Sequence, residues 1–242
     1  MLPTKDANFV SAELAKRFGL PLWQFTVSAT DANRHVIRYS RLITRRKKII
    51  VIDRCYHGSV DESFATLDNQ GNTVAREGNI GAPVELDQTT RVVAFNNLDD
   101  MKSALNHNDV AAILMEPAMT NVGIVLPQPG YLKAVEKLAK EYGAKLIIDE
   151  THTISVGPGG MTAQEGLQPD FLTIGKAIGG GFPTGAFGMR EEIARSIKEM
   201  VELEVIDTGG VGGTLAANAL SMAAMKATLT KVLTAENFEK MV

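Results

Sequence analysis

A chain of 242 residues, 45% hydrophobic and 22% charged, is long enough to bury a large core and has the composition of an ordinary globular protein. Its formal net charge of -3 gives no reason to expect nucleic acid or an acidic membrane surface as a partner. The single cysteine, Cys55, excludes an intramolecular disulfide, and with four scattered histidines it offers no metal-ligand spacing.

The first eight residues lack the apolar core of a signal peptide, and no apolar run approaches the length needed to cross a bilayer. We therefore expect a cytoplasmic protein in a reducing environment, with no membrane partner.

Helical and strand-like patterns alternate along the chain, which favours an α/β fold with a mainly parallel sheet flanked by helices. The predicted helices cover residues 10–18, 31–44, 131–142 and 216–233. The predicted strands cover residues 22–27, 48–52, 91–95, 110–115, 145–149, 171–174 and 183–189, the last running back along its neighbour. Because no linker or repeat interrupts this order, we expect one domain over residues 1–242.

Lys176 follows strand 171–174 in an apolar, glycine-rich run without charged neighbours. Desolvation there would favour the neutral amine, which can attack a carbonyl carbon to form a Schiff base. The alternative is a lysine that ends a strand and points into water. Asp149 ends another strand, and open parallel sheets bind ligands just beyond such ends. The two residues therefore predict a site for aldehyde-cofactor chemistry.

Two blocks, residues 146–153 and 169–176 in that order, resemble the class III aminotransferases of the fold-type-I pyridoxal phosphate superfamily, in particular the glutamate-1-semialdehyde aminomutase-like members. The order of Tyr56-His57-Gly58-Ser59, Glu116-Pro117 and Asn121 agrees with this resemblance, which runs from about residue 23 to 222. The resemblance implies the large domain of that fold, pyridoxal 5'-phosphate as cofactor, and a small-molecule amino donor with a keto or aldehyde acceptor.

By this resemblance, Lys176 matches the lysine that holds the cofactor aldehyde as an imine and afterwards shuttles the substrate proton. Asp149 matches the acid that pairs with the protonated pyridine nitrogen. A carboxylate there keeps the ring cationic, and a cationic ring stabilises a carbanion by withdrawing electrons. The alternative for Asp149 is a strand-end carboxylate that caps the next turn.

Ser28, Ala29 and Thr30 lie at a predicted strand-to-helix turn, where the family binds the cofactor phosphate. Backbone N–H groups and the positive end of a helix suit an anion at that point. Ala29 replaces the usual glycine, which alanine can mimic in most but not all backbone conformations. Ser28 and Thr30 could instead simply cap the helix, and both interpretations can hold together.

Tyr56 matches the family's aromatic residue that stacks on the cofactor ring, and His57 belongs to the same loop. Core packing is an equally good explanation for this pair taken alone. Asn121, five positions after Glu116, matches the residue near the cofactor's phenolic oxygen, and both are assigned to the cofactor site by resemblance.

Gly213 and Thr214 resemble the segment that reaches the phosphate of the neighbouring subunit's cofactor, which implies a homodimer. The alternative is a loop that caps the following helix. Family members also carry a longer N-terminal segment and a C-terminal small domain beyond the position of Val242. We therefore expect a fragment, without an identifiable arginine for a substrate carboxylate.

Three functions remain open from the sequence. The first is an aminotransferase, the second an intramolecular aminomutase that uses the same residues, and the third a cofactor-binding protein that is catalytically incomplete. A dinucleotide-binding domain is disfavoured, because no glycine cluster follows a strand in the required Gly-x-Gly-x-x-Gly register.

Overall fold

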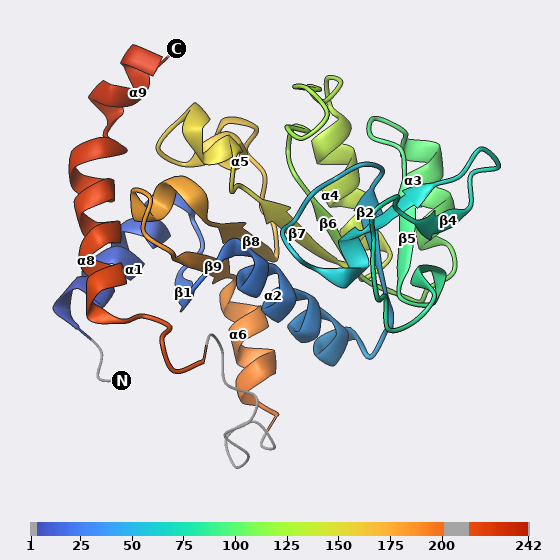
Figure 1. Ribbon diagram of the computed structural model, residues 1–242, viewed down its shortest axis with the longest axis horizontal. Helices are drawn as coiled ribbons and strands as arrows, with labels where there is room; N and C mark the ends of the chain where they lie inside the picture. Colours follow the sequence, from blue (N-terminus) through green and yellow to red (C-terminus); the bar gives the residue numbers. More distant parts are fainter. Residues whose placement is uncertain (1–3, 201–212, 242) are drawn as a thin grey trace.

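A seven-stranded sheet forms the centre of the molecule in the computed structural model, which describes residues 4–200 and 213–241 (Figure 1). The strand order is β1-β9-β8-β7-β6-β2-β5. Their bounds are β1 Leu22–Thr26, β2 Lys48–Ile52, β5 Thr90–Val93, β6 Val110–Met115, β7 Lys145–Asp149, β8 Phe171–Ile174 and β9 Gly185–Met189. Only β9 runs against its neighbours, since β1 and β8 both pair with it antiparallel and the remaining pairs are parallel. The predicted mainly parallel sheet is confirmed.

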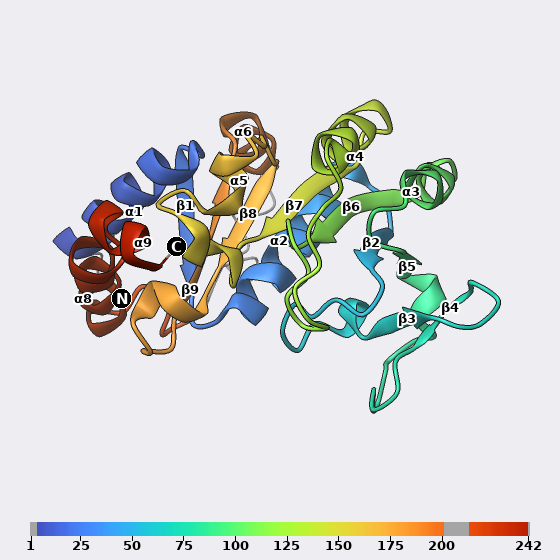
Figure 2. The ribbon, with the colours of Figure 1, turned by 90° about the horizontal axis from the view of Figure 1, so that it is seen from above.

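Helices cover both faces of this sheet. Their bounds are α1 Lys5–Phe18, α2 Ala29–Thr44, α3 Leu98–Leu105, α4 Tyr131–Glu141, α5 Gly160–Gln164, α6 Glu191–Lys198, α8 Ala219–Ala227 and α9 Ala235–Met241. Figure 2 shows α2 on one side of the sheet and α3 and α4 on the other. In the described part of the chain, no helix is both long and apolar enough to span a bilayer.

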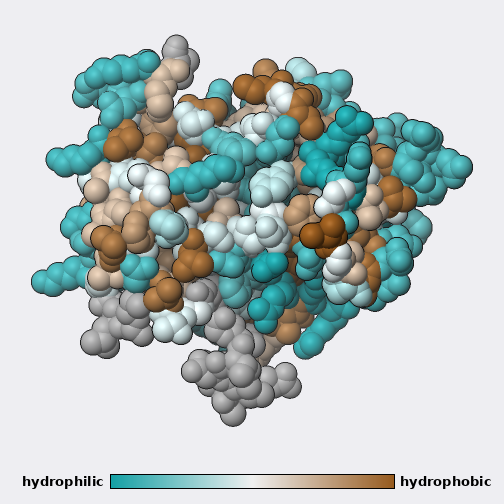
Figure 3. All heavy atoms as spheres, in the orientation of Figure 1, coloured by the Kyte–Doolittle hydropathy of each residue, from teal (hydrophilic) through white to brown (hydrophobic). Residues whose placement is uncertain are grey.

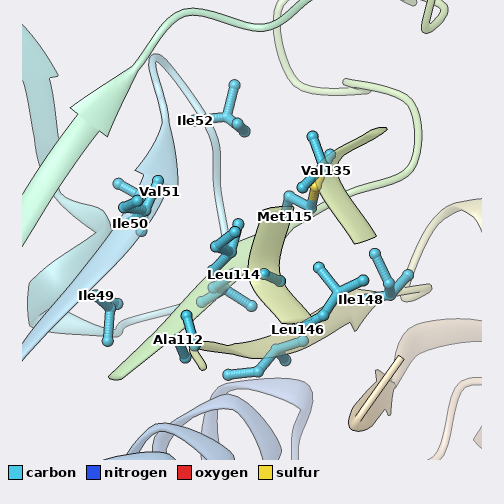
Figure 4. Close-up of a cluster of buried hydrophobic side chains, with 14 of the residues drawn as sticks. Ile49, Ile50, Val51, Ile52, Ala112, Leu114, Met115, Val135, Leu146 and Ile148 are labelled. Atoms are coloured by element: carbon cyan, nitrogen blue, oxygen red, sulfur yellow. The ribbon is translucent and has the colours of Figure 1, made fainter. Parts of the chain in front are cut away.

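The core forms where continuous apolar strands meet the helices. Every residue of β6 is buried, as are residues 49–52 of β2 and 146–149 of β7. Figure 4 shows apolar side chains of these three strands, among them Ile52, Leu114 and Ile148, together with Val135 of α4. Burying each large aliphatic side chain contributes about 1.5–3 kcal/mol, so the three strands form a rigid support for whatever follows their carboxyl ends.

Helices α1 and α8 pack side by side, although they lie far apart in sequence (Figure 1). Arg17 in α1 donates to the carbonyls of Leu229 and Leu233 at 2.9 and 2.8 Å. Lys226 in α8 pairs with Asp6 at 2.7 Å. These bonds tie the two ends of the described chain to one edge of the sheet.

The strands predicted at 48–52, 110–115, 145–149 and 171–174 match the structure residue for residue. The helix predicted over 216–233 is confirmed over residues 219–232, but it starts three residues later than predicted. Asn218 caps its first part, α8, by accepting from the backbone N–H of Ser221 at 2.9 Å, and residues 228–232 continue it as a π-helical turn. A short hairpin, β3 Ala65–Leu67 with β4 Thr73–Ala75, and helices α3, α5, α6 and α9 were not predicted.

Candidate active site

A cavity of about 400 Å³ opens beyond the carboxyl ends of β7 and β8. Asp149 is the last residue of β7 and pairs in register with Thr173 of β8, so Lys176 follows only three positions later on the neighbouring strand. The cavity brings together most of the predicted site residues: Ser28, Ala29, Thr30, Tyr56, His57, Glu116, Asp149 and Lys176. The topology therefore gathers groups that are up to 148 positions apart in the sequence.

Lys176 is held by an unusual backbone conformation at the end of β8. Its φ of 44° is left-handed, a region that costs a residue with a Cβ about 1–2 kcal/mol. Lys176 is exposed and lines the cavity. The prediction that its amine is buried away from water is therefore wrong for this single chain. Tyr56, 43% exposed, lines the same cavity and presents an aromatic ring to it.

Asp149 lies at the centre of a buried hydrogen-bond network. Its Oδ2 atom is 2.8 Å from His57 Nδ1 and accepts from Asn33 Nδ2 at 2.9 Å. Its Oδ1 atom accepts from the backbone N–H of Thr151 at 3.0 Å. Asn33 in turn contacts Thr173, and we call Asp149, His57, Asn33 and Thr173 the floor network. All four residues are at most 3% exposed.

The orientation of the Asn33 amide follows from its partners. Asn33 Nδ2 lies 2.9 Å from the Asp149 carboxylate and 3.1 Å from the His57 carbonyl, and both groups can only accept. The nitrogen must therefore face them, and Asn33 Oδ1 accepts from the Thr173 hydroxyl at 2.7 Å. One amide on α2 thus links β7, β8 and the loop after β2.

The floor network holds a charged pair. Burial alone would lower the pKa of His57, but the neighbouring Cys55 sulfur and the Asp149 carboxylate raise it above its ordinary value of 6.5. Burial alone would raise the pKa of Asp149, but hydrogen bonds and the charge of His57 hold it below its ordinary value of 3.8. Asp149 therefore stays ionised, with an imidazolium beside it.

Glu150, next to Asp149, has a different role. Its fully buried carboxylate accepts from Thr153, from Thr162 and from the backbone of Met161, which surround it behind the cavity. Burial, opposed by these hydrogen bonds, raises its pKa. Glu150 fixes the turn after β7, whereas Asp149 faces the cavity.

Helix α2 points its N-terminus into the cavity. Ser28 caps the helix by accepting from the Asp31 backbone N–H at 3.1 Å, so the capping interpretation holds while Ser28 also lines the cavity. Ala29 is the first residue of α2 and does not have the positive φ that would favour glycine at this position. The departure from glycine at position 29 therefore costs no strain.

A glycine is required where the Tyr56 loop approaches this helix. Gly58 has a φ of 82°, and a Cβ added there would lie 2.0 Å from Thr30 Oγ1. Thr30 Oγ1 also accepts from the Ser59 backbone N–H at 3.1 Å. The loop carrying Tyr56 and His57 is thereby fixed to the first turn of α2.

A second carboxylate and histidine, Glu116 and His152, also line the cavity. His152 Nδ1 lies 3.3 Å from Glu116 Oε2, and Thr120 Oγ1 contacts both atoms. We call Glu116, Thr120 and His152 the wall cluster. Glu116 is 5% exposed, whereas the His152 side chain is 29% exposed.

Asn121 and the segment at Gly213 do not line this cavity. Asn121 is exposed and donates to Glu116 Oε1 at 3.1 Å, so it contacts the wall cluster instead. Gly213 and Thr214 are also exposed, and they precede α8, which packs against α1. The preceding residues of the predicted loop, 209–212, lie outside the described residues.

Sequence reasoning missed Asn33, Thr173, Thr120 and His152. The signal for Asn33 is a polar residue on the apolar face of α2, where its helical neighbours Ala32, Val36 and Ile37 are all buried. His152 follows Asp149 by three positions, so it is carried to the same end of β7.

The chain is similar to known proteins over most of its length. The sequence model of the family described as Aminotransferase class-III matches residues 3–242. A glutamate-1-semialdehyde 2,1-aminomutase of Ignicoccus hospitalis is 36% identical, over 91% of this chain and 52% of that protein. One from Acidobacterium capsulatum is 38% identical, over 86% of this chain and 48% of that protein.

Solved structures agree with this similarity. A glutamate-1-semialdehyde-aminomutase from Pseudomonas aeruginosa PAO1 superposes with a TM-score of 0.94 at 48% identity, over 98% of this chain and 53% of the other. A lysine-to-alanine variant of such an enzyme, in complex with PMP, has the same TM-score of 0.94 at 47% identity, over 100% and 54% of the two chains. An omega-transaminase from Sphaerobacter thermophilus gives 0.84 at 30% identity, over 98% and 56%. The chain thus spans about half the length of the proteins it matches.

Proposed function

The chain belongs to the class III aminotransferase family, and from that premise we propose that the protein is a pyridoxal phosphate-dependent aminotransferase that moves an amino group from a small amino donor to a keto or aldehyde acceptor. The observation that carries the proposal is the placement of Lys176 and Asp149 at the ends of neighbouring strands, in one cavity with the N-terminus of α2. An amine, a permanent carboxylate and a helix N-terminus are the three groups that a phosphorylated pyridine aldehyde needs.

The residues of the cavity fit pyridoxal phosphate. The hydroxyl of Thr151 is buried, lies beside Asp149 and has no hydrogen-bond partner among the described residues, so it has capacity for a ligand. Ser28, Ala29 and Thr30 form a helix first turn whose N–H groups lack intrahelical acceptors. The exposed face of Tyr56 offers a surface for a planar ring.

Each of these residues then has a defined task. Residues Ser28 to Thr30 would bind the phosphate, Tyr56 would stack on the ring, and Asp149 would hold the pyridine nitrogen protonated. When bound, the cofactor supplies a cationic ring that withdraws electrons from the substrate. Lys176 Nζ would bind the cofactor aldehyde and would take and return the proton of the substrate alpha carbon. Glu116 and His57 also line the cavity, and His57 would hold the Asp149 carboxylate in place through its Nδ1 atom.

Covalent labelling tests the proposal directly. The protein is incubated with pyridoxal phosphate, reduced with borohydride and analysed by peptide mass spectrometry. We expect a pyridoxyl adduct on Lys176, and we expect Lys176→Ala to lose both the adduct and the visible absorbance band. An unchanged spectrum in Lys176→Ala, or an adduct confined to other lysines, would refute the assignment. Lys145→Ala, at the opposite end of β7, is the matched control.

An intramolecular aminomutase is the second candidate. It is supported by the names of the relatives that are 36% and 38% identical and of a structural neighbour that is 48% identical. The same residues serve either reaction, since the two differ in whether the carbonyl product stays bound. Amino transfer to an added keto acid favours the aminotransferase, and rearrangement without an acceptor favours the aminomutase. An absorbance band that the amino substrate does not bleach would indicate a cofactor-binding protein without turnover.

We further propose that the protein acts as a homodimer in the cytoplasm, with the whole chain as one cofactor-binding domain. Thr214 is exposed and remote from the cavity of its own subunit, which suits a residue that serves a neighbouring one. Leu215 and Leu220 beside it are 64% and 61% exposed, and Figure 3 shows apolar atoms over α8 and over the loop between β6 and α4. The single thiol, Cys55, is buried and reduced.

Subunit mixing tests the shared site. Light scattering gives the mass of the assembly, and co-expression of Lys176→Ala with Thr214→Ala should restore part of the activity that each variant lacks. A monomeric mass, or no restoration by mixing, would contradict the shared site.

A further inference from the structure

The wall cluster fixes which nitrogen of His152 carries a proton. The Glu116 carboxylate can only accept, so Thr120 donates its one hydroxyl hydrogen to Glu116 Oε2. Towards His152 Nδ1, the Thr120 oxygen can then only accept. His152 Nδ1 must therefore carry a hydrogen, directed at Thr120 and at Glu116 Oε2, which lies 3.3 Å away.

This assignment leaves His152 Nε2 as the reactive atom. In the neutral ring with a hydrogen on Nδ1, Nε2 carries a lone pair that can accept a proton. The ring lines the cavity and its side chain is 29% exposed, so a small molecule in the cavity can reach it. His57 has the same pairing with a carboxylate, but its side chain has no exposed surface.

We propose that His152 is an acid–base residue of this cavity, whose Nε2 takes a proton from the ammonium group of the incoming amino donor. The inference deepens the proposed function and rests on it. Amino donors arrive protonated at neutral pH, because amines of the lysine type have a pKa near ~10. Only the free amine can attack a carbonyl carbon. His152 would convert one into the other.

The proton transfer is balanced and needs no further reactant. The nitrogen–hydrogen bond of the ammonium breaks, its electron pair stays on the amine, and the proton binds His152 Nε2. Neutral imidazole and ammonium become imidazolium and neutral amine. The Glu116 carboxylate stabilises the resulting positive charge through the hydrogen bond that Nδ1 already makes.

Other charged groups face the same cavity from each neighbouring element. Glu116 follows β6, Asp149 ends β7 and Lys176 follows β8, while His57 follows β2 beside Tyr56. Asp149 and His57 neutralise each other at 2.8 Å. Glu116 is therefore the negatively charged group in direct contact with His152, at 3.3 Å from its Nδ1 atom.

The tautomer can be measured without cofactor or activity. Histidine nitrogen chemical shifts from NMR of the isotope-labelled protein distinguish the two neutral forms, and His152→Gln assigns the signal. We expect His152 to carry its hydrogen on Nδ1. A hydrogen on Nε2 in the neutral form would overturn the proposal, because the cavity would then contain no basic nitrogen at this position.

A pH series tests the role. We expect His152→Gln to lower kcat/KM for the amino donor about 100-fold near neutral pH, the range typical of a lost acid–base residue. The deficit should shrink as the pH rises, because solution then supplies the free amine. Glu116→Gln, which keeps an acceptor but removes the charge that stabilises the imidazolium, should also lower kcat/KM for the amino donor, with a deficit that shrinks as the pH rises. A deficit that is constant with pH indicates a structural role and contradicts the proposal.

The controls separate this inference from the proposed function. His107→Gln changes an exposed histidine remote from the cavity and should match the wild type. The borohydride adduct on Lys176 should persist in His152→Gln. If the wild type forms no adduct, the proposed function fails, whereas an adduct with a constant deficit refutes only the role of His152. If His152→Gln does not fold, the NMR measurement of the wild-type tautomer and the pH series of Glu116→Gln still test the proposal.

Discussion

The floor network and the wall cluster each contain a carboxylate paired with a histidine, but the two pairs differ in their exposure to the cavity. Both place a carboxylate against Nδ1 of a histidine, at 2.8 Å for Asp149 and His57 and at 3.3 Å for Glu116 and His152. The residues of the floor network are buried, including Asn33 and Thr173, whereas the side chain of His152 in the wall cluster is partly exposed. The comparison teaches that burial, rather than residue type, decides whether such a pair holds a fixed charge or exchanges a proton.

The largest effect is expected from the charge of the floor. Asp149→Asn keeps the size of the side chain and removes the carboxylate, so under the proposed function the cofactor ring would lose the partner that keeps it cationic. We expect cofactor binding to remain measurable and the proton-transfer step to slow by at least about 100-fold. Single-turnover absorbance measures this step. Turnover near that of the wild type would show that the floor does not need its charge.

The amide of the floor is the next target. Asn33→Leu has a similar size but leaves the Thr173 hydroxyl and the His57 carbonyl without their buried partner. Buried polar groups left unpaired cost about 1–3 kcal/mol each, so we expect a loss of at least about 2 kcal/mol in unfolding free energy. Urea denaturation measures it. Asn69→Leu, at an exposed turn, should change stability by less than about 0.5 kcal/mol, and an equal loss in both variants would contradict the role of Asn33.

The charged pair of the floor should also give stability a pH dependence. Because the folded-state pKa of His57 lies above 6.5, its protonation stabilises the fold fully below pH 6.5, and this stabilisation is lost as pH rises through the folded-state pKa. The advantage of the wild type over His57→Gln should therefore shrink above pH 6.5, by up to about 1.4 kcal/mol per pH unit for one proton. Denaturation at a series of pH values checks this, and parallel curves for the two proteins would contradict it.

The smallest effect is expected at the wall. Thr120→Val removes the hydroxyl between Glu116 and His152 at a half-buried position, so we expect a stability loss of about 1 kcal/mol or less. Glu116 remains as acceptor, and His152 should keep its hydrogen on Nδ1 in the NMR measurement. A loss as large as that of Asn33→Leu would mean that the wall is as tightly determined as the floor.

The sequence predicted the strands and the residues at their ends well. Continuous apolar runs such as 110–115 and 145–149 leave little choice of structure, and the order of the strands places Asp149 and Lys176 in the lining of one cavity. It could not predict the partners of Asp149, since Asn33 lies 116 positions away and becomes a partner only when α2 crosses the sheet. It could not predict the exposure of Lys176 either, because a glycine-rich segment is compatible with both a buried and an exposed lysine. Asn218, a capping residue before Ala219, was a readable signal that the last predicted helix starts later.

Pairing of the first strand, β1, has to wait until β9 has been synthesised. Strand β1, with Trp23 and Phe25, has β9 as its sheet neighbour, and Leu22 meets Met189 more than 160 residues later in the chain. At about 5–20 residues per second, a ribosome needs roughly ten to thirty seconds to supply that partner. For this interval β1 has no neighbour in the sheet, so its backbone hydrogen-bonding groups and its apolar side chains lack the partner that β9 provides in the folded protein.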